Sequence, residues 1–270
     1  MGKITSNKMH IVTFSVALLS AAVTQIACAA DPIIDDQWRG LGTLSLVSSS
    51  GNTESSTLNF MLNMDRQSTI DKWSFYLQDL NAKATTTTNG VRETSTTAAL
   101  WRTGGRYDRN FNADLLGFVG LGLDHDGKKD LSLRKTVNLG VGDHVLKDDS
   151  AVLDVYGGVN LRNDKYNDPG VMVNNELKTS YNATELLLSE EFSYKFNENT
   201  HLKESFVAYP NLTTSGKFRS VFDISLSVAM NKTLSLTASF QDRYDNLAQA
   251  PIKPNDALLM VGVSMNLGPN

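Results

Sequence analysis

The sequence contains a single cysteine, Cys28, among its 270 residues. Cys28 lies at the end of a segment with the features of an export signal, so the exported chain is expected to have no disulfide, thiol chemistry or cysteine-bound metal. After residue 30, no apolar run approaches the roughly 20 residues that a membrane-spanning helix requires. This excludes a helical membrane protein but not a β-barrel, because each barrel strand carries only a weak hydropathy signal.

Clusters of basic residues and interdomain linkers are also missing. The chain has 25 basic and 29 acidic residues, and two of the basic ones lie in the first 30 positions, which leaves 23 against 29, or a net charge of −6. Such a balance does not suit binding to a nucleic-acid backbone. No Pro/Gly/Ser-rich stretch divides the rest, so residues 31–270 are predicted to form one domain, with loops around 163–175 and 246–255.

Residues 1–30 have the pattern of a signal peptide. Lys3 and Lys8 precede an apolar stretch from residue 11 to about residue 27, and small residues follow up to Asp31. A membrane anchor is disfavoured because Ser15, Ser20, Thr24 and Gln25 dilute the stretch. A lipid-modified Cys28 is also disfavoured, since Gln25 stands where such sites usually carry an aliphatic residue. We therefore expect export across the inner membrane.

The exported chain alternates between apolar and polar residues. In residues 222–229, for example, Phe222, Ile224, Leu226 and Val228 share one face and small or polar residues share the other. Segments such as 131–146 and 217–230 keep an extended character for longer than the 9–11 residues of a tilted membrane strand. Soluble strands average about 5–6 residues. Long strands with a polar inner face favour a transmembrane antiparallel β-barrel over a dry sandwich.

Turn residues divide the chain into about twelve strands. An even number suits a bacterial outer-membrane barrel with both ends of the chain in the periplasm, short turns at that end and longer loops at the other. The predicted strands cover residues 38–49, 54–65, 71–84, 91–104, 111–124, 130–146, 151–163, 180–196, 200–210, 217–230, 233–244 and 255–267.

Two sets of side chains follow from this assignment. Aromatic residues near strand ends are predicted to form the two interfacial girdles of a membrane barrel, with Trp38, Trp73 and Trp101 near the periplasmic ends and Tyr166, Tyr209 and Tyr244 near the outer ends. Charged residues on the polar faces are predicted to line the lumen: Arg134, Asp154, Arg162, Asp223 and Arg243. Such groups either pair to brace the barrel or set a field for passing solutes.

The order of several short motifs resembles a known family. These motifs are Trp38-Arg39-Gly40, residues 50–54 (SGNTE), residues 130–134 (DLSLR), residues 139–142 (LGVG), residues 156–159 (YGGV) and Arg243-Tyr244-Asp245. Over nearly all of the exported chain, they are similar to those of the YdiY-like salt-induced outer-membrane proteins, a family of unassigned biochemical function. The resemblance implies an outer-membrane barrel and hints at salt or osmotic stress, but it supplies no catalytic residue. The C-terminal residues 267–270 depart from the aromatic ending common in such barrels.

Few residues in the chain indicate a catalytic or metal-binding site. The exported histidines, His125, His144 and His201, have no serine two residues away, as some barrel lipid hydrolases do. Asp124, Asp126 and Asp130 do not have the spacing of an EF-hand loop and are interpreted as a solvated turn. We therefore predict no catalytic site, no metal and no cofactor. The expected partners are outer-membrane lipid and lipopolysaccharide and the barrel-insertion machinery, and the sequence does not reveal an oligomeric state.

Four functions remain open at this point. About twelve strands lie between filled eight-stranded barrels and wide porins, so the first is a narrow porin-like channel for ions or small solutes. The second is a plugged barrel with a structural role in the envelope. The third is an outer-membrane enzyme that modifies lipid, and the fourth is a soluble periplasmic β-protein.

Overall fold

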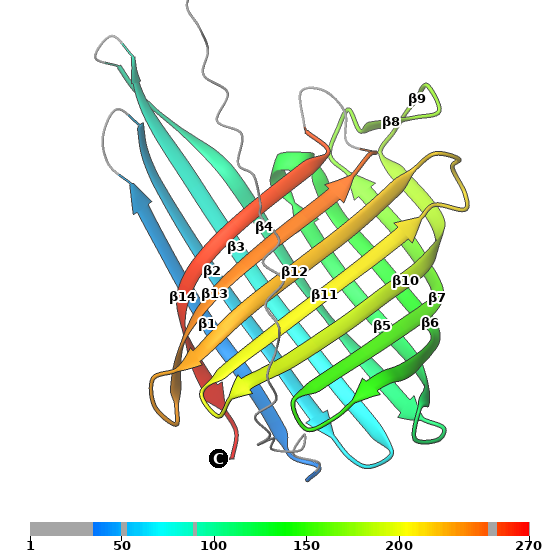
Figure 1. The fold of residues 1–270 in the computed structure, drawn as a ribbon. Helices are drawn as coiled ribbons and strands as arrows, with labels where there is room; N and C mark the ends of the chain where they lie inside the picture. Colours follow the sequence, from blue (N-terminus) through cyan, green and yellow to red (C-terminus); the bar gives the residue numbers. More distant parts are fainter. Residues whose placement is uncertain (1–34, 50–52, 89–90, 248–252, 270) are drawn as a thin grey trace, which may run out of the picture.

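A computed structural model of the chain describes residues 35–49, 53–88, 91–247 and 253–269. The predicted signal peptide lies outside the described residues. Twelve antiparallel strands form a closed barrel in the order β1-β14-β13-β12-β11-β10-β7-β6-β5-β4-β3-β2, and β8 and β9 form a separate hairpin (Figure 1). The predicted all-β fold and the number of barrel strands are confirmed. Within the described residues, no helix is long and apolar enough to cross a membrane.

Most strands begin and end close to the predicted residues. Their bounds are β1 Trp38–Ser49, β2 Thr53–Gln67, β3 Asp71–Thr88, β4 Val91–Asn110, β5 Leu115–Asp126, β6 Leu131–Lys147, β7 Ala151–Tyr166, β10 Ser180–Asn197, β11 Thr200–Pro210, β12 Phe218–Ala229, β13 Leu234–Asp245 and β14 Asn255–Leu267. The fourth strand is longer than predicted and ends at Asn110 because residues 105–110 continue the alternation. The long connection after β7 contains the unpredicted hairpin of β8 (Val171–Val173) and β9 (Glu176–Lys178).

The two ends of the barrel differ in their connections. One end, here called the turn end, carries the short turns that join β2 to β3, β4 to β5, β6 to β7, β10 to β11 and β12 to β13, together with the C-terminus (Figure 1). In the β6–β7 turn, amide hydrogen bonds from Ser150 and Ala151 hold the pKa of Asp148 below its ordinary value. The opposite end, here called the loop end, carries the longer loops and the hairpin β8–β9.

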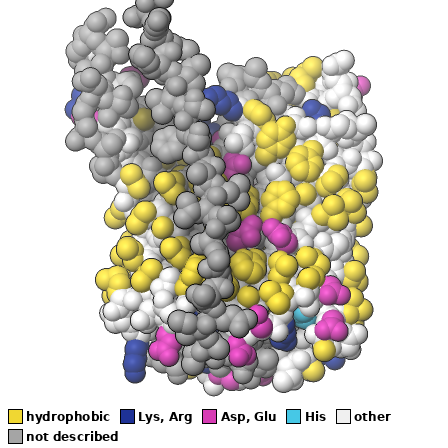
Figure 2. Space-filling model, viewed as in Figure 1, with side chains coloured by type: hydrophobic (Ala, Val, Ile, Leu, Met, Phe, Trp, Pro, Cys, Tyr) yellow, Lys and Arg dark blue, Asp and Glu magenta, His cyan; other side chains and the backbone are white. Residues whose placement is uncertain are grey.

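The outer surface of the barrel is apolar. Leu44, Leu121, Leu139, Leu188 and Val263 on five different strands are each more than one-third exposed. Hydrophobic side chains gather in a band around the face shown in Figure 2. Exposing so many apolar side chains is unfavourable in water but favourable in lipid. The closed barrel also leaves few backbone amides and carbonyls unpaired within the hydrocarbon layer. The chain is therefore a membrane barrel of the outer-membrane type.

One junction in the wall is short. β1 and β14 are paired only from Gly40↔Leu267 to Leu44↔Val263, which is five residue pairs, whereas every other neighbouring pair of barrel strands has at least nine. Beyond Leu44 the two strands diverge toward the loop end (Figure 1). We call this junction the seam.

Glycines on the inner wall allow close approach of strands β6 and β7. A Cβ added to Gly140 would lie 2.2 Å from the carbonyl oxygen of Gly157 and 2.7 Å from the Cα of Gly158. Gly157 faces outward, and a Cβ added there would meet nothing within 4 Å. The first position therefore requires glycine, and the second does not.

We predict that Gly140→Ala lowers the free energy of unfolding by about 1–3 kcal/mol, because the neighbouring backbone must shift. Urea unfolding of the refolded barrel, followed by heat-modifiable mobility, measures the change. The matched control is Gly157→Ala, which is expected to leave the unfolding midpoint unchanged. Equal effects of the two substitutions would contradict this account of the β6–β7 junction.

Candidate functional site

The five charged residues predicted to line the lumen all lie on the inner face of the wall, because each occupies the polar side of an alternating strand. The structure distributes them over three levels. Arg134 and Arg162 lie toward the loop end, Asp223 and Arg243 near the middle, and Asp154 toward the turn end. At each level they join further polar side chains.

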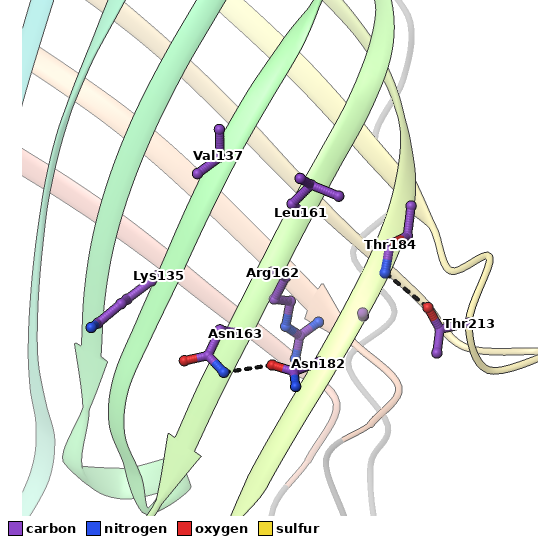
Figure 3. A pocket seen from close by; sticks show the side chains of 9 residues that line it. Lys135, Val137, Leu161, Arg162, Asn163, Asn182, Thr184 and Thr213 are labelled. Carbon is purple, nitrogen blue, oxygen red and sulfur yellow. Dashed lines mark hydrogen bonds between the residues drawn. The ribbon is translucent and has the colours of Figure 1, made fainter.

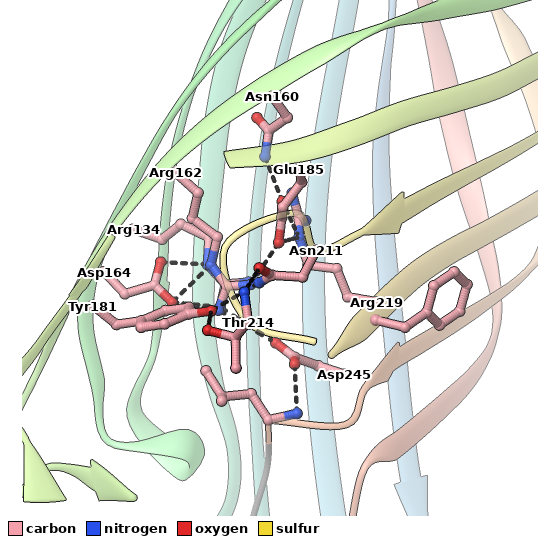
Figure 4. Close-up of polar contacts among 12 residues, drawn as sticks. Arg134, Asn160, Arg162, Asp164, Tyr181, Glu185, Asn211, Thr214, Arg219 and Asp245 are labelled. Atoms are coloured by element: carbon pink, nitrogen blue, oxygen red, sulfur yellow. Dashed lines mark hydrogen bonds and ion pairs between the residues drawn. The ribbon is translucent and has the colours of Figure 1, made fainter. Parts of the chain in front are cut away.

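The level nearest the loops contains a network of three arginines and three carboxylates, shown in Figure 4 and called here the loop-end network. Arg134 donates through Nε to Asp164 at 2.8 Å. Arg162 donates to Glu185 at 3.0 Å, and Arg219 donates to the other oxygen of Glu185 at 2.9 Å. The sixth member is Asp245, which lies 3.4 Å from Arg134. The charges of the network balance.

The loop-end network crosses the lumen, and several of its side chains are almost fully buried. Arg134 on β6 and Asp245 on β13 are on strands that are not neighbours in the wall, so their contact bridges the interior. The side chains of Asp164, Glu185 and Arg162 are only 0%, 1% and 2% exposed. Buried ions are tolerated when each is paired and hydrogen-bonded, and here every carboxylate contacts at least two donors.

Apolar residues cover this network at the barrel mouth. Val173 of the β8–β9 hairpin and Leu247 of the β13–β14 loop are 2% and 3% exposed and pack with Tyr181 and Ala183 of β10. Lys129, beside β6, forms an ion pair with Asp256 of β14 at 2.6 Å across the same mouth. Side chains thus cover the lumen at its loop end.

A second network lies toward the turn end, and some of its side chains are more exposed to solvent. Arg106 donates to Glu191 at 2.6 Å and contacts Asp108 at 2.8 Å. The Tyr156 ring lies 4.5 Å from the Arg106 guanidinium. His144 contacts Asp154 at 2.6 Å. We call these residues the turn-end network; the Glu191 side chain remains 35% exposed and that of Arg106 22%.

The middle level links strands that are not neighbours in the wall, through fewer contacts. Arg243 donates to Gln78 at 3.1 Å, from β13 to β3. Asp223 accepts a hydrogen bond from Gln241. Arg102 lies 4.0 Å from Asp124, and the two side chains are 22% and 29% exposed. Both signs of charge are therefore present along the whole lumen.

The inner face also holds an apolar cluster that the sequence did not predict. Leu116, Phe118, Tyr156 and Leu187 are buried there, with Phe118 and Tyr156 packed edge to face. Space for these rings comes from inward-facing glycines: Phe118 lies over Gly140 and Tyr156 over Gly142. A strictly polar inner face was therefore the wrong expectation on the β5–β7 side.

The predicted aromatic girdles need correction at three positions. Tyr166 points inward, where its hydroxyl donates to Asp164, and Tyr209 points inward against the Arg219 guanidinium at 3.5 Å. Both share the inner face of their strands with the charged network. Trp101 faces outward but lies toward the loop end, beside His125, because β4 extends past its predicted end.

The remaining three girdle residues lie near strand ends on the outer face. Trp38 and Trp73 are 44% and 45% exposed at the turn end. Tyr244 packs beside Phe218 at the loop end, with their ring centroids 6.1 Å apart.

The histidines and acidic residues do not form a recognisable reaction centre. His125 stacks on Trp101 outside the barrel, whereas His144 pairs with Asp154 inside it. Asp126 accepts hydrogen bonds from the amides of Lys128 and Lys129 and so closes the turn after β5. Among the described residues, no three His, Cys, Asp or Glu side chains are grouped so that they could hold a metal ion.

Comparison with known proteins gives a family without an assigned activity. A family model described as "Protein of unknown function, DUF481" matches residues 42–266. This agrees with the expected barrel family of unassigned function, although the match does not carry the YdiY-like name. No curated protein matches the sequence significantly.

Several solved membrane barrels are similar in outline. The COG4313 outer membrane channel from Pseudomonas putida F1 has 10% identity and a TM-score of 0.43, with coverage of 92% of this chain and 100% of that one. The NanC porin has 8% identity and a TM-score of 0.42, with coverage of 85% and 97%. The KdgM porin has 9% identity and a TM-score of 0.40, with coverage of 84% and 98%. Likeness at this level transfers no activity.

The buried ion pairs lead to a stability prediction. Glu185→Gln leaves Arg162 and Arg219 without their shared carboxylate, so we expect a loss of about 3–5 kcal/mol in the free energy of unfolding. Urea unfolding in detergent measures it. Glu54→Gln is the matched control, because the Glu54–Arg92 pair is exposed and its loss is expected to cost less than about 1 kcal/mol. A Glu185 variant as stable as the Glu54 variant would contradict the bracing role.

Proposed function

Because the chain belongs to DUF481, a family described only as being of unknown function, we propose an activity from the lumen itself: a narrow, passive outer-membrane channel for ions or other small solutes. The loop-end network is its constriction. The proposal includes no cofactor and no catalytic step.

The main support for this proposal is that the exposure of inward charged side chains changes along the lumen. Inward charged side chains of the turn-end and middle levels, such as Glu191, Asp124 and Arg102, are 35%, 29% and 22% exposed, so water reaches them inside the wall. In the loop-end network, the side chains range from 0% exposed at Asp164 to 17% at Asp245, whereas those of the turn-end network range from 5% at Asp108 to 35% at Glu191. This gradient supports an aqueous lumen that narrows toward the loops.

The charges support a preference for cations at the turn-end network. Arg106 contacts Asp108 and Glu191 there, and Asp154 lies beside Tyr156, so that with Lys72 opposite Asp108 three carboxylates face two basic side chains. A ring with excess acidic groups attracts cations into a narrow pore. The role in salt or osmotic stress implied by the family resemblance fits a pore that passes small ions and holds back larger solutes, and it stays part of the proposal.

A closed structural barrel is the second candidate. The observation that favours it is the buried loop-end network, because ion pairs that span the lumen would also block the passage of solutes. The two candidates differ in one measurable property, which is whether the unaltered barrel conducts.

The test is single-channel recording of the refolded exported chain in planar bilayers. We expect discrete conductance steps, and larger steps for the double variant Arg134→Gln/Asp245→Asn, which removes one cross-lumen pair without leaving either charge unpaired. Arg106→Gln is expected to increase the preference for cations. The control Arg92→Gln, at the exposed loop-end hairpin of β3 and β4, is expected to change neither property.

Either of two other results would contradict the proposed channel. Steps only in the double variant would identify a closed barrel whose lumen the network plugs. Absence of steps from both proteins, with folding verified by heat-modifiable mobility, would overturn the channel altogether.

A further inference from the structure

A hollow lies on the outside of the barrel. It has a volume of about 440 Å³ and lies on the outer side of β6, β7 and β10, toward the loop end (Figure 3). Its outward side chains are those of Lys135, Val137, Leu161, Asn163, Asn182 and Thr184, and Thr213 of the β11–β12 loop closes one side.

Strand register arranges these side chains in rows across the three strands. One row consists of Lys135, Asn163 and Asn182, and the next row toward the turn end consists of Val137, Leu161 and Thr184. The row after that, Leu139, Val159 and Leu186, is entirely aliphatic. The hollow therefore straddles the line where the polar rim meets the apolar belt.

The polar part of the hollow is preformed. Asn163 donates to Asn182 at 2.5 Å, and the Thr184 amide donates to Thr213 at 2.8 Å, which fixes the loop against β10. A neighbouring bond from the Leu212 amide to the Thr184 carbonyl, also at 2.8 Å, secures the same loop. These hydrogen bonds thus hold the polar side chains and the β11–β12 loop of the hollow in place.

The charge at this place is positive. Lys165 lies one row above Lys135, across from Leu133, and both lysine side chains face outward and are exposed. The outward residues of these rows, from Leu133–Lys165–Ser180 to Leu139–Val159–Leu186, include no acidic side chain. Two cations above an apolar trough complement an anionic headgroup attached to acyl chains.

We propose that this hollow is a binding site for a phosphorylated glycolipid of the outer leaflet. Lys135 and Lys165 contact its phosphate groups, Asn163 and Asn182 contact the sugar hydroxyls, and one acyl chain lies over Val137 and Leu161. The outer leaflet is the one that faces the loop end when both chain ends lie in the periplasm. The site is on the outside of the wall and does not depend on whether the lumen conducts.

Native mass spectrometry of the refolded exported chain in neutral detergent tests this site. The probes are a bisphosphorylated lipid A, the same lipid without phosphates, and phosphatidylethanolamine. We expect one retained lipid A, and about tenfold weaker retention by Lys135→Gln/Lys165→Gln, since two exposed ionic contacts are lost. Leu161→Trp, which fills the hollow without changing its charge, is expected to weaken retention as well.

The control variant is Lys83→Gln, which removes an exposed lysine on β3 at the same end of the barrel. It is expected to retain lipid A as the unaltered protein does. Equal retention of the dephosphorylated lipid, or unchanged retention by the double lysine variant, would overturn the proposal. Heat-modifiable mobility of each variant verifies that it is folded.

Discussion

The closed ladder of backbone hydrogen bonds is the constraint on which the rest of this structure depends. Inside a bilayer, each unpaired amide or carbonyl costs several kcal/mol, so the twelve strands must return to β1. Closure then forces strict alternation, because each residue faces either lipid or lumen. The outer face becomes largely apolar, and the charged side chains that face inward meet in one narrow interior, where opposite charges pair.

The interior shows how such crowding is resolved. At the loop end, the arginines and carboxylates are buried, and a buried charge without a partner is costly. They therefore pair in a neutral network that spans the lumen. Toward the turn end, side chains of the same kinds reach 35% exposure at Glu191, and carboxylates lie beside Arg106 and Lys72. On the β5–β7 side, glycines make room for Phe118 and Tyr156. One wall therefore presents three different surfaces to a solute.

Alternation made the strands and the inward direction of Arg134 and Asp223 predictable, because period two leaves only two choices for each side chain. It could not show which inward residues meet across the lumen. Glu185 lies between Ala183 and Leu187 on its face, and this apolar local pattern does not indicate a charged network. Tyr166 and Tyr209 were misplaced for a related reason: a tyrosine near a strand end suits a lipid interface and a buried ion pair equally well, and only the register of β7 and β11 decides between them.

The seam between the first and last strands has a mechanical meaning. With five residue pairs holding β1 to β14, against nine or more at every other junction, this line has the fewest inter-strand hydrogen bonds to resist separation. β1 and β14 are the first and last strands of the barrel in chain order, and their junction makes the cylinder continuous. Forced opening of the wall would therefore start along this line, where separation breaks the fewest strand pairs.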